Sequence, residues 1–400
     1  MDLNLRPQAS AEPEGLGLVL TGGGARSAYQ VGVLRALARR WPSLRIPIIT
    51  GVSAGAINAV FLASRETDFL LATEELADFW ADLTTEQVFR TDVPFLARNL
   101  LRWGARLVSG GSSLAPDVRG LVDTAPLAHL LSGVLSAAPD GHIPGIQRNL
   151  EAGNLEAISL TTLDYATGRT VVWIQGCGKH DWQRPNRLSV KTRLGIDHVM
   201  ASSSLPLFFP AVRVADSWHG DGGIRQSAPL SPAIRLGAKR ILAISTRHRR
   251  TSRPALETMV SYPSPAHILG RLFNSIFLDA IDEDAERAER MNRLSRHLPT
   301  THRGELRPID ALVVRPSEDL GRIAGDFEMR LPRGFRFLTR GLGTKETATP
   351  DFLSLLLFQP DYLRALIKIG EADAAQRMSE LEALVEPEKS AASVPEATAR

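Results

Sequence analysis

The chain has 400 residues, enough for one large domain or two ordinary ones. Its content of 44% hydrophobic and 23% charged residues is typical of a soluble globular protein, and the formal net charge of +3 does not indicate nucleic-acid binding. The single cysteine, Cys177, excludes an intrachain disulfide. The first residues lack the apolar segment of a secretory signal, and every apolar stretch is shorter than the roughly 20 residues that span a bilayer. We therefore expect a cytoplasmic protein, and peripheral contact with a membrane stays open.

The first 64 residues alternate between strand and helix patterns. A buried apolar run ends in the glycines of "LGLVLTGGG", and a helical pattern with basic residues in its last turn follows over 27–40. A second apolar strand over 45–53 leads into an alanine-rich helix over 54–64. This order of strand, helix, strand and helix is typical of a parallel α/β sheet.

The α/β pattern resumes after a mostly helical and irregular stretch over 65–150. Two β-rich runs flank "DYATG" and predict a hairpin over 155–175. The remaining patterns predict a short helix over 195–204, a strand and turn over 212–223, a helix and strand over 231–246, one long helix over 266–298, a further strand of the same sheet over 309–316, and helices over 350–384.

These segments group into four parts. A polar flexible tail covers 1–14, a core covers 15–250, and a low-complexity disordered tail covers 386–400. Between the core and the last tail, we expect a C-terminal extension over 251–385 that packs on the core. This extension would contain the long helix, the late strand and the closing helices.

The pentapeptide "GVSAG" provides a candidate nucleophile. Gly51, Ser53 and Gly55 match G-x-S-x-G between a predicted strand and a predicted helix, which is the context of a nucleophile elbow. The serine of an elbow sits on a strained turn with its hydroxyl exposed, and a side chain at either glycine would clash with the neighbouring strand and helix. The alternative is an ordinary strand-to-helix turn with a serine N-cap.

The triple glycine Gly22-Gly23-Gly24 follows the first strand and precedes a helix. A dinucleotide site is weakly supported, because Ser27 stands where the third glycine of that fingerprint belongs and the second strand does not end in an acidic residue. An oxyanion hole fits better, because glycine amides at a helix N-terminus can converge on a developing negative charge. Arg26 would add a charge there or orient the loop. A tight turn without a ligand is the remaining alternative.

A serine nucleophile needs a base. His198, His219 and His248 have the chain order of a triad histidine, but none lies in a local pattern that marks one. Asp221, followed by Gly222 and Gly223, ends a predicted strand in a tight turn. A carboxylate held against Ser53 can act as the base directly, and a simple hairpin turn is the alternative interpretation.

Together, "GGGAR", "GVSAG" and "DGG" resemble the motifs of the patatin-like phospholipases, a family of lipid acyl hydrolases with a Ser-Asp dyad. The stretch "ASSSLPLFFPAV" over 201–212 is similar to the block that precedes the dyad aspartate in this family. The resemblance covers about 15–250, and it implies a three-layer α/β/α sandwich with a mostly parallel central sheet, followed here by C-terminal helices.

The resemblance also implies roles for individual residues. Ser53 would be the nucleophile and Asp221 its base, with no metal or cofactor. Gly22, Gly23, Gly24 and Arg26 would form the oxyanion loop, although Ser27 replaces a glycine that usually ends it. The substrate would be a lipid or another fatty acyl ester. A carboxylesterase or thioesterase with a histidine triad, or a non-catalytic lipid-binding scaffold, are the alternatives.

The segment 94–110 is a candidate for contact with lipid surfaces. Arg98, Arg102 and Arg106 recur every four residues among apolar side chains, as in a cationic helix at a membrane interface. An amphipathic helix packed on the core is the alternative interpretation.

Overall fold

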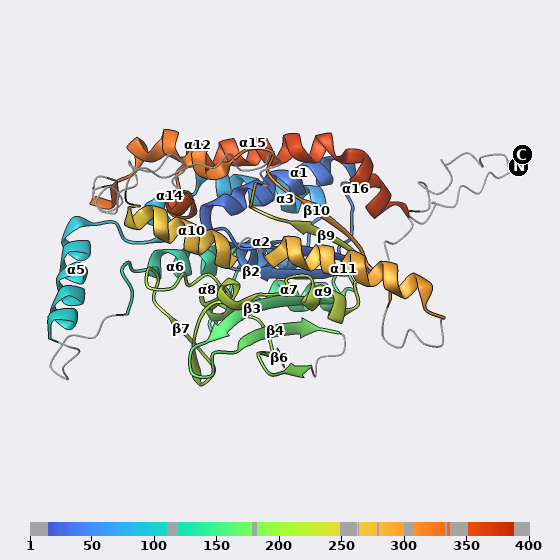
Figure 1. The fold of residues 1–400 in the computed structure, drawn as a ribbon, viewed down its shortest axis with the longest axis horizontal. Helices are drawn as coiled ribbons and strands as arrows, with labels where there is room; N and C mark the ends of the chain where they lie inside the picture. The colour runs from blue at the N-terminus through green and yellow to red at the C-terminus, as the bar shows by residue number, and fades with distance from the viewer. Residues whose placement is uncertain are drawn as a thin grey trace, which may run out of the picture.

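The computed structural model describes residues 15–109, 119–177, 182–248, 262, 264–277, 280–299, 307–332, 334–336 and 351–387. They form a mixed α/β fold around one sheet with the strand order β10-β9-β1-β2-β3-β4-β6-β5, and β7 and β8 branch from β3 (Figure 1). The strands are β1 (Leu16–Leu20), β2 (Ile48–Val52), β3 (Ala157–Asp164), β4 (Thr170–Gly176), β5 (Gln183–Arg184), β6 (Arg187–Lys191), β7 (Val212–Val214), β8 (Ser217–Asp221), β9 (Arg240–Ile244) and β10 (Asp310–Val314).

The centre of the sheet is parallel. Each neighbouring pair from β10 through β9, β1 and β2 to β3 runs parallel, so the predicted strand-helix-strand units and the predicted late strand are confirmed. The predicted hairpin is the antiparallel pair of β3 and β4. Strand β8 pairs antiparallel with the end of β3 and places Asp221 opposite Thr162. The carboxyl ends of β1 and β2 and the end of β8 thus lie at one edge of the sheet.

Short 3-10 turns and helices connect these strands. In the first half of the chain they are η1 (Gly24–Ser27), α1 (Ala28–Arg40), α2 (Ala54–Ser64), α3 (Phe69–Asp82), α4 (Thr85–Val88), α5 (Val93–Val108), α6 (Ala125–Val134) and α7 (Pro144–Glu151). In the second half they are α8 (Ile196–Ser202), η2 (Gly222–Arg225), α9 (Ser231–Leu236), α10 (Pro265–Phe277), α11 (Ala280–His297), α12 (Leu320–Phe327), η4 (Glu328–Arg330), α14 (Asp351–Leu356), α15 (Pro360–Gln376) and α16 (Met378–Val385).

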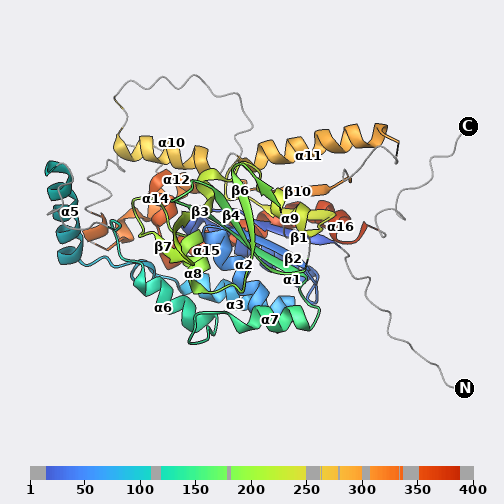
Figure 2. The same cartoon turned by 90° about the horizontal axis from the view of Figure 1, so that it is seen from below.

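Helices cover both faces of the sheet. Leu18 and Leu20 of β1 face a core shared with α1, α2, α3 and α15, whereas the alternating Val19 faces a second core with α9 and α11. Figure 2 shows α11 on one side of the sheet and α3 and α7 on the other. The predicted three-layer α/β/α sandwich is therefore confirmed.

The predicted long helix coincides with helical structure on both sides of two residues that are not described. The range 266–298 contains two helices, α10 and α11, and residues 278 and 279 between them lie outside the described residues. The two helices have different neighbours, because α10 packs against α14 and η2 and α11 packs against β10. The helical periodicity of the sequence continues over both helices, because periodicity does not depend on which element a helix packs against.

The C-terminal helices belong to the same core. α15 packs along α1 at a close crossing, where a Cβ on Gly370 would lie 2.2 Å from the carbonyl oxygen of Tyr29. The predicted tail over 1–14 and nearly all of that over 386–400 lie outside the described residues. The proposed boundary near residue 250 stays a prediction.

Helix α5 projects from the body of the molecule at the end where α10 and α14 lie, in both views (Figures 1 and 2). Among its described side chains, Leu96 is buried, whereas Leu100, Leu101 and Val108 are 55%, 74% and 92% exposed. The interpretation of 94–110 as a helix packed on the core therefore fails for most of its length. None of the helices within the described ranges combines the length and the apolar character needed to cross a membrane.

Candidate active site

Ser53 occupies a sharp turn between β2 and α2. Its backbone has φ 57° and ψ −137°, a sparsely populated conformation for a residue with a side chain. The turn is crowded, because a Cβ on Gly55 would lie 2.4 Å from the carbonyl oxygen of Leu20, and one on Gly51 would lie 2.7 Å from Cα of Ala56. Glycines at these two positions thus allow β1, β2 and α2 to converge beneath Ser53.

The triple glycine lies directly beside this turn. A Cβ on Gly22 would lie 3.4 Å from Ser53 Oγ, and both Gly23 and Gly24 line the same pocket as Ser53. Within the described residues, the amides of Gly23 and Gly24 donate no hydrogen bond to backbone or side-chain acceptors. They are therefore available as donors to a substrate.

The carbonyl groups of this loop fix where those amides point. The Gly22 carbonyl accepts a hydrogen bond from Thr246 Oγ1 at 2.8 Å, and the Gly23 carbonyl accepts one from the Arg26 amide at 3.1 Å. In a trans peptide, the N–H of the next residue points opposite to the carbonyl. The bonds to Gly22 and Gly23 thus orient the N–H groups of Gly23 and Gly24 away from the supporting scaffold.

Asp221 ends β8 and is fully buried. Its Oδ1 accepts a hydrogen bond from the Gly223 amide at 2.8 Å, and a Cβ on Gly222 would lie 2.3 Å from the carbonyl oxygen of Thr161. Its Oδ2 is buried and accepts no hydrogen bond of good geometry from a described residue. The Ser53 hydroxyl nevertheless lies close enough to the carboxyl group to lower its pKa. Burial raises the pKa of Asp221 to about 7, and the Ser53 hydroxyl and the Gly223 amide each lower this pKa in part.

The serine tract at the end of α8, which includes Ser202 and Ser204, is hydrogen-bonded to the backbones of both Ser53 and Asp221. Ser202 Oγ accepts from the Ser53 amide at 3.0 Å and donates to the Thr161 carbonyl at 2.7 Å. The Ser204 carbonyl accepts from the Asp221 amide at 3.0 Å. The tract thus connects the backbones of Ser53 and Asp221 from beneath, a function that the sequence pattern of 201–212 did not reveal.

Arg26 lies outside the pocket lining. Its side chain is 4% exposed and turns toward α14, where Nε donates to Ser354 Oγ at 2.6 Å and one terminal nitrogen contacts Asp351 Oδ1 at 2.9 Å. The other terminal nitrogen donates to Asn274 Oδ1 at 3.3 Å. The Arg26 side chain therefore contacts α14 and is not part of the pocket lining, and its predicted role in the oxyanion loop stays a prediction.

The candidate histidines are engaged elsewhere. His219 Nδ1 lies 3.1 Å from Thr162 Oγ1, and no hydrogen bond joins His219 to Ser53 or Asp221 among the described residues. Burial lowers the pKa of His198 to about 4, and its Nδ1 accepts from the Gly195 amide. His248 Nδ1 lies 2.9 Å from the Pro316 carbonyl. Ser53 thus has a carboxyl group rather than an imidazole as its neighbour.

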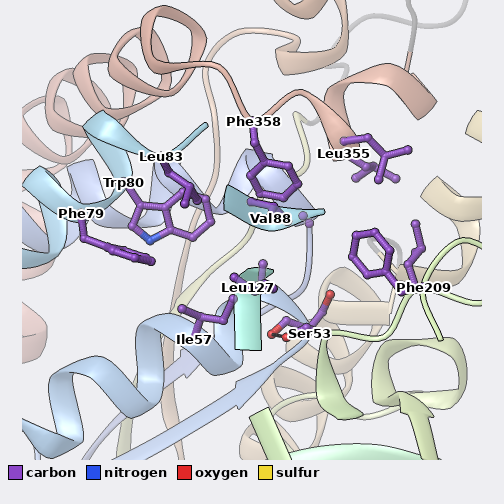
Figure 3. A pocket seen from close by; sticks show the side chains of 16 residues that line it. Ser53, Ile57, Phe79, Trp80, Leu83, Val88, Leu127, Phe209, Leu355 and Phe358 are labelled. Carbon is purple, nitrogen blue, oxygen red and sulfur yellow. Dashed lines mark hydrogen bonds between the residues drawn. The ribbon is translucent and has the colours of Figure 1, made fainter. Parts of the chain in front are cut away.

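An apolar pocket opens beside Ser53 (Figure 3). It lies between α3, α6, the 205–209 loop and the C-terminal segment, and its space amounts to about 640 Å³ when the part open to solvent is included. No charged side chain lies among its described lining residues. Its lining residues are Gly23, Gly24, Ser53, Ala54, Ile57, Phe79, Trp80, Leu83, Val88, Leu127, Ser203, Leu205, Phe209, Leu355, Leu356 and Phe358. Sequence analysis did not identify the contributions of α3 and the C-terminal segment, because no local pattern distinguishes a pocket wall from an ordinary core.

The described part of the chain contains no group of three or more histidine, cysteine, aspartate or glutamate side chains arranged to hold a metal ion.

Comparison with known proteins gives a family match and solved structures of low similarity. A family model described as patatin-like phospholipase matches residues 18–234. Human GIVD cytosolic phospholipase A2 is 12% identical, with a TM-score of 0.46, over 94% of this chain and 60% of that chain. VipD from Legionella pneumophila is 11% identical, with a TM-score of 0.36, over 92% of this chain and 67% of that chain. A search of curated protein sequences gave no match.

Proposed function

Since a single family model matches more than half of its residues, the chain belongs to the patatin-like phospholipase family, and we propose that it is a lipid acyl hydrolase that uses Ser53 and Asp221 as a catalytic dyad. The observation that supports this most strongly is the convergence of three groups at one sheet edge. These groups are the strained serine, a buried carboxyl beside it and two glycine amides that have no acceptor among the described residues.

The proposed reaction proceeds through an acyl-enzyme. Asp221 accepts the hydroxyl proton of Ser53 while Oγ attacks the ester carbonyl carbon, and the amides of Gly23 and Gly24 donate to the resulting oxyanion. The C–O bond to the alcohol then breaks, and the alcohol leaves with the proton held by Asp221. Water attacks the acyl-enzyme as Asp221 takes one of its protons, and that proton returns to Ser53 when the fatty acid leaves.

The pocket supports a fatty acyl chain as the recognised part of the substrate. Its wall consists of aliphatic and aromatic side chains such as Trp80 and Phe358, whose rings stack with centroids 6.4 Å apart. Burial of each methylene of an acyl chain there contributes about 0.8 kcal/mol. A charged head group would find no partner among the described lining residues, and we infer that it lies outside the pocket.

Hydrolysis of acyl esters of increasing chain length, together with phospholipid vesicles, tests the proposal. Ser53→Ala is expected to lower kcat at least about 1,000-fold, because the nucleophile is lost. Ser295→Ala is the matched control, since this buried serine lies on α11 and its hydroxyl donates a local hydrogen bond to the Asn292 carbonyl. Turnover that survives in folded Ser53→Ala protein contradicts the dyad, and a folded wild type without turnover on any ester supports the scaffold alternative.

We further propose that α5 places the enzyme on anionic lipid surfaces. It projects from the body with Leu100 and Leu101 exposed, and Arg98 and Arg102 on the same helix are exposed as well. Apolar side chains that enter the interface and arginines that attract anionic lipids are the two components of such binding. Near the middle of the helix, the side-chain amide of Asn99 donates to the Leu121 carbonyl at 3.2 Å.

Co-sedimentation with anionic and neutral vesicles tests this contact. Replacement of Leu100 and Leu101 by serine is expected to reduce vesicle binding and vesicle hydrolysis severalfold, and to leave the hydrolysis of a short soluble ester unchanged. Leu71→Ser is the matched control, because Leu71 is 54% exposed on α3. Equal vesicle binding by the α5 variant and this control would reject the role of α5.

A further inference from the structure

Helix α14 contacts the glycine loop from outside the segment that matches the family model. Residues 18–234 contain the serine, the aspartate and the glycines, whereas α14 begins at Asp351. Even so, a Cβ on Gly24, whose φ is +54°, would lie 2.1 Å from the Leu355 carbonyl oxygen. The backbone of the loop therefore lies directly against the backbone of α14, and no other residue type fits between them.

The Arg26 side chain connects the glycine loop to α14 through several hydrogen bonds. Two nitrogens of its guanidinium donate to Ser354 Oγ and to both the carbonyl and the carboxylate of Asp351. Ser354 Oγ in turn donates to the Asp351 carbonyl at 2.6 Å, so its lone pairs face Arg26. The charges are nearly inaccessible, since the Arg26 and Asp351 side chains are 4% and 11% exposed. A planar guanidinium bound by several buried acceptors has little freedom to move.

The backbone of the same arginine acts on the proposed oxyanion donors. The Arg26 amide donates to the Gly23 carbonyl, and this carbonyl belongs to the peptide unit whose N–H is the Gly24 donor. A shift of Arg26 would rotate that peptide and move the N–H away from the position where charge develops. Oxyanion donors act through such preorganisation, and a small misplacement lowers the rate strongly.

We propose that Asp351 and Ser354 are positioning residues for catalysis, which hold the oxyanion loop in its active geometry through Arg26. This inference rests on the proposed function and adds to it that the catalytic machinery is complete only with α14. Neither residue touches the substrate pocket, since the pocket lining includes Leu355 and Leu356 but not Asp351 or Ser354. Their loss should therefore affect the chemical step more than substrate binding.

The test compares kcat and KM in the full-length protein on an ester that the wild type hydrolyses. Asp351→Asn is expected to lower kcat between tenfold and one hundredfold, with KM within about twofold of the wild-type value. Ser354→Ala keeps the ion pair and should lower kcat by a smaller factor, about threefold to tenfold. It serves as the second variant if Asp351→Asn folds poorly.

Glu382→Gln is the matched control. It removes a side-chain carboxylate of the C-terminal helix α16, which pairs at the surface with Arg40 in the last turn of α1 and does not contact the loop through Arg26. It should leave both kinetic constants unchanged. Wild-type values of kcat in both Asp351→Asn and Ser354→Ala would overturn the positioning role while the proposed function stands. A rise in KM with an unchanged kcat would also overturn it, whereas a wild type without turnover overturns the proposed function itself.

Discussion

The two sides of the pocket differ in physical character. The side formed by strand ends carries the strained Ser53 and two amides that have no acceptor among the described residues, with the buried carboxyl of Asp221 beside Ser53. These polar groups lie within a few residues of a glycine. On the C-terminal side, the apolar side chains of Leu355, Leu356 and Phe358 line the pocket. The polar contact of this segment is made by its backbone, since the Phe358 carbonyl accepts a hydrogen bond from Thr85 Oγ1. We therefore expect reactivity and selectivity to reside in different segments, so that substitutions in each segment should have separable effects.

Asp221→Asn should produce the largest effect, and its consequences for activity and stability should be opposite. The amide cannot accept the Ser53 proton, so we expect kcat to fall at least about 1,000-fold. Burial raises the pKa of Asp221 to about 7, far above that of an exposed aspartate, so ionisation of this carboxyl opposes folding above neutral pH. The variant should therefore be more stable than the wild type at pH 8, by up to about 4 kcal/mol in chemical denaturation.

The same stability measurement contains its own control. At pH 4 the carboxyl is protonated in the folded protein, and the stabilising effect of the asparagine should almost vanish. A variant that is less stable than the wild type at pH 8 would show that the carboxylate has a stabilising partner, contrary to the geometry described above.

The pH dependence of wild-type activity and stability should reflect the side of the pocket formed by strand ends, because Asp221 belongs to that side. The general base must be ionised, so log kcat/KM should rise with a slope of about one below pH 7 and level off above it. Stability should show the reverse trend, because the raised pKa of Asp221 adds stability at low pH that is lost as the pH rises through about 7. A profile that levels off near pH 4 would indicate a carboxyl with an ordinary pKa.

The reacting side was largely predictable from sequence because its requirements are local. Ser53 and the glycine loop each occupy a turn between a strand and a helix, and the steric need for glycine leaves a recognisable pattern. Parallel strands end at one edge, so the convergence of two such turns follows from strand order. The position of Asp221 followed from the resemblance to a family, since a D-G-G turn alone has many ordinary explanations.

The C-terminal side could not be predicted, because its contacts are long-range. Arg26 meets Ser354 across 328 positions of sequence, and a lone serine in an apolar helix carries no sign of a distant partner. The projection of α5 was also hidden, because an amphipathic pattern does not distinguish a helix that faces the core from one that faces a lipid surface. Packing partners and surroundings decide these features, whereas local patterns record only periodicity.

A change on the C-terminal side should alter selectivity more than chemistry. Phe358→Leu replaces the ring that stacks on Trp80 with a smaller aliphatic side chain. We expect the preference for long over short acyl chains to change severalfold, with kcat on a short ester nearly unchanged. Phe335→Leu is the matched control, since Phe335 is buried against Phe89 but is not part of the pocket lining. An equal loss of activity on all chain lengths would contradict the division between the two sides.

His219→Gln should have the smallest effect, and it tests whether every polar group near the reacting side takes part in the reaction. His219 lies on β8, two residues before Asp221, but its Nδ1 faces Thr162 and its ring packs edge-on against Trp173. Burial lowers the pKa of His219, which favours the neutral imidazole, and the glutamine can keep a hydrogen bond to Thr162. We expect kcat to change less than about threefold, measured beside Asp221→Asn on one ester. A loss as large as that of Asp221→Asn would favour the histidine triad, because only a histidine that carries the proton would be as indispensable as the base itself.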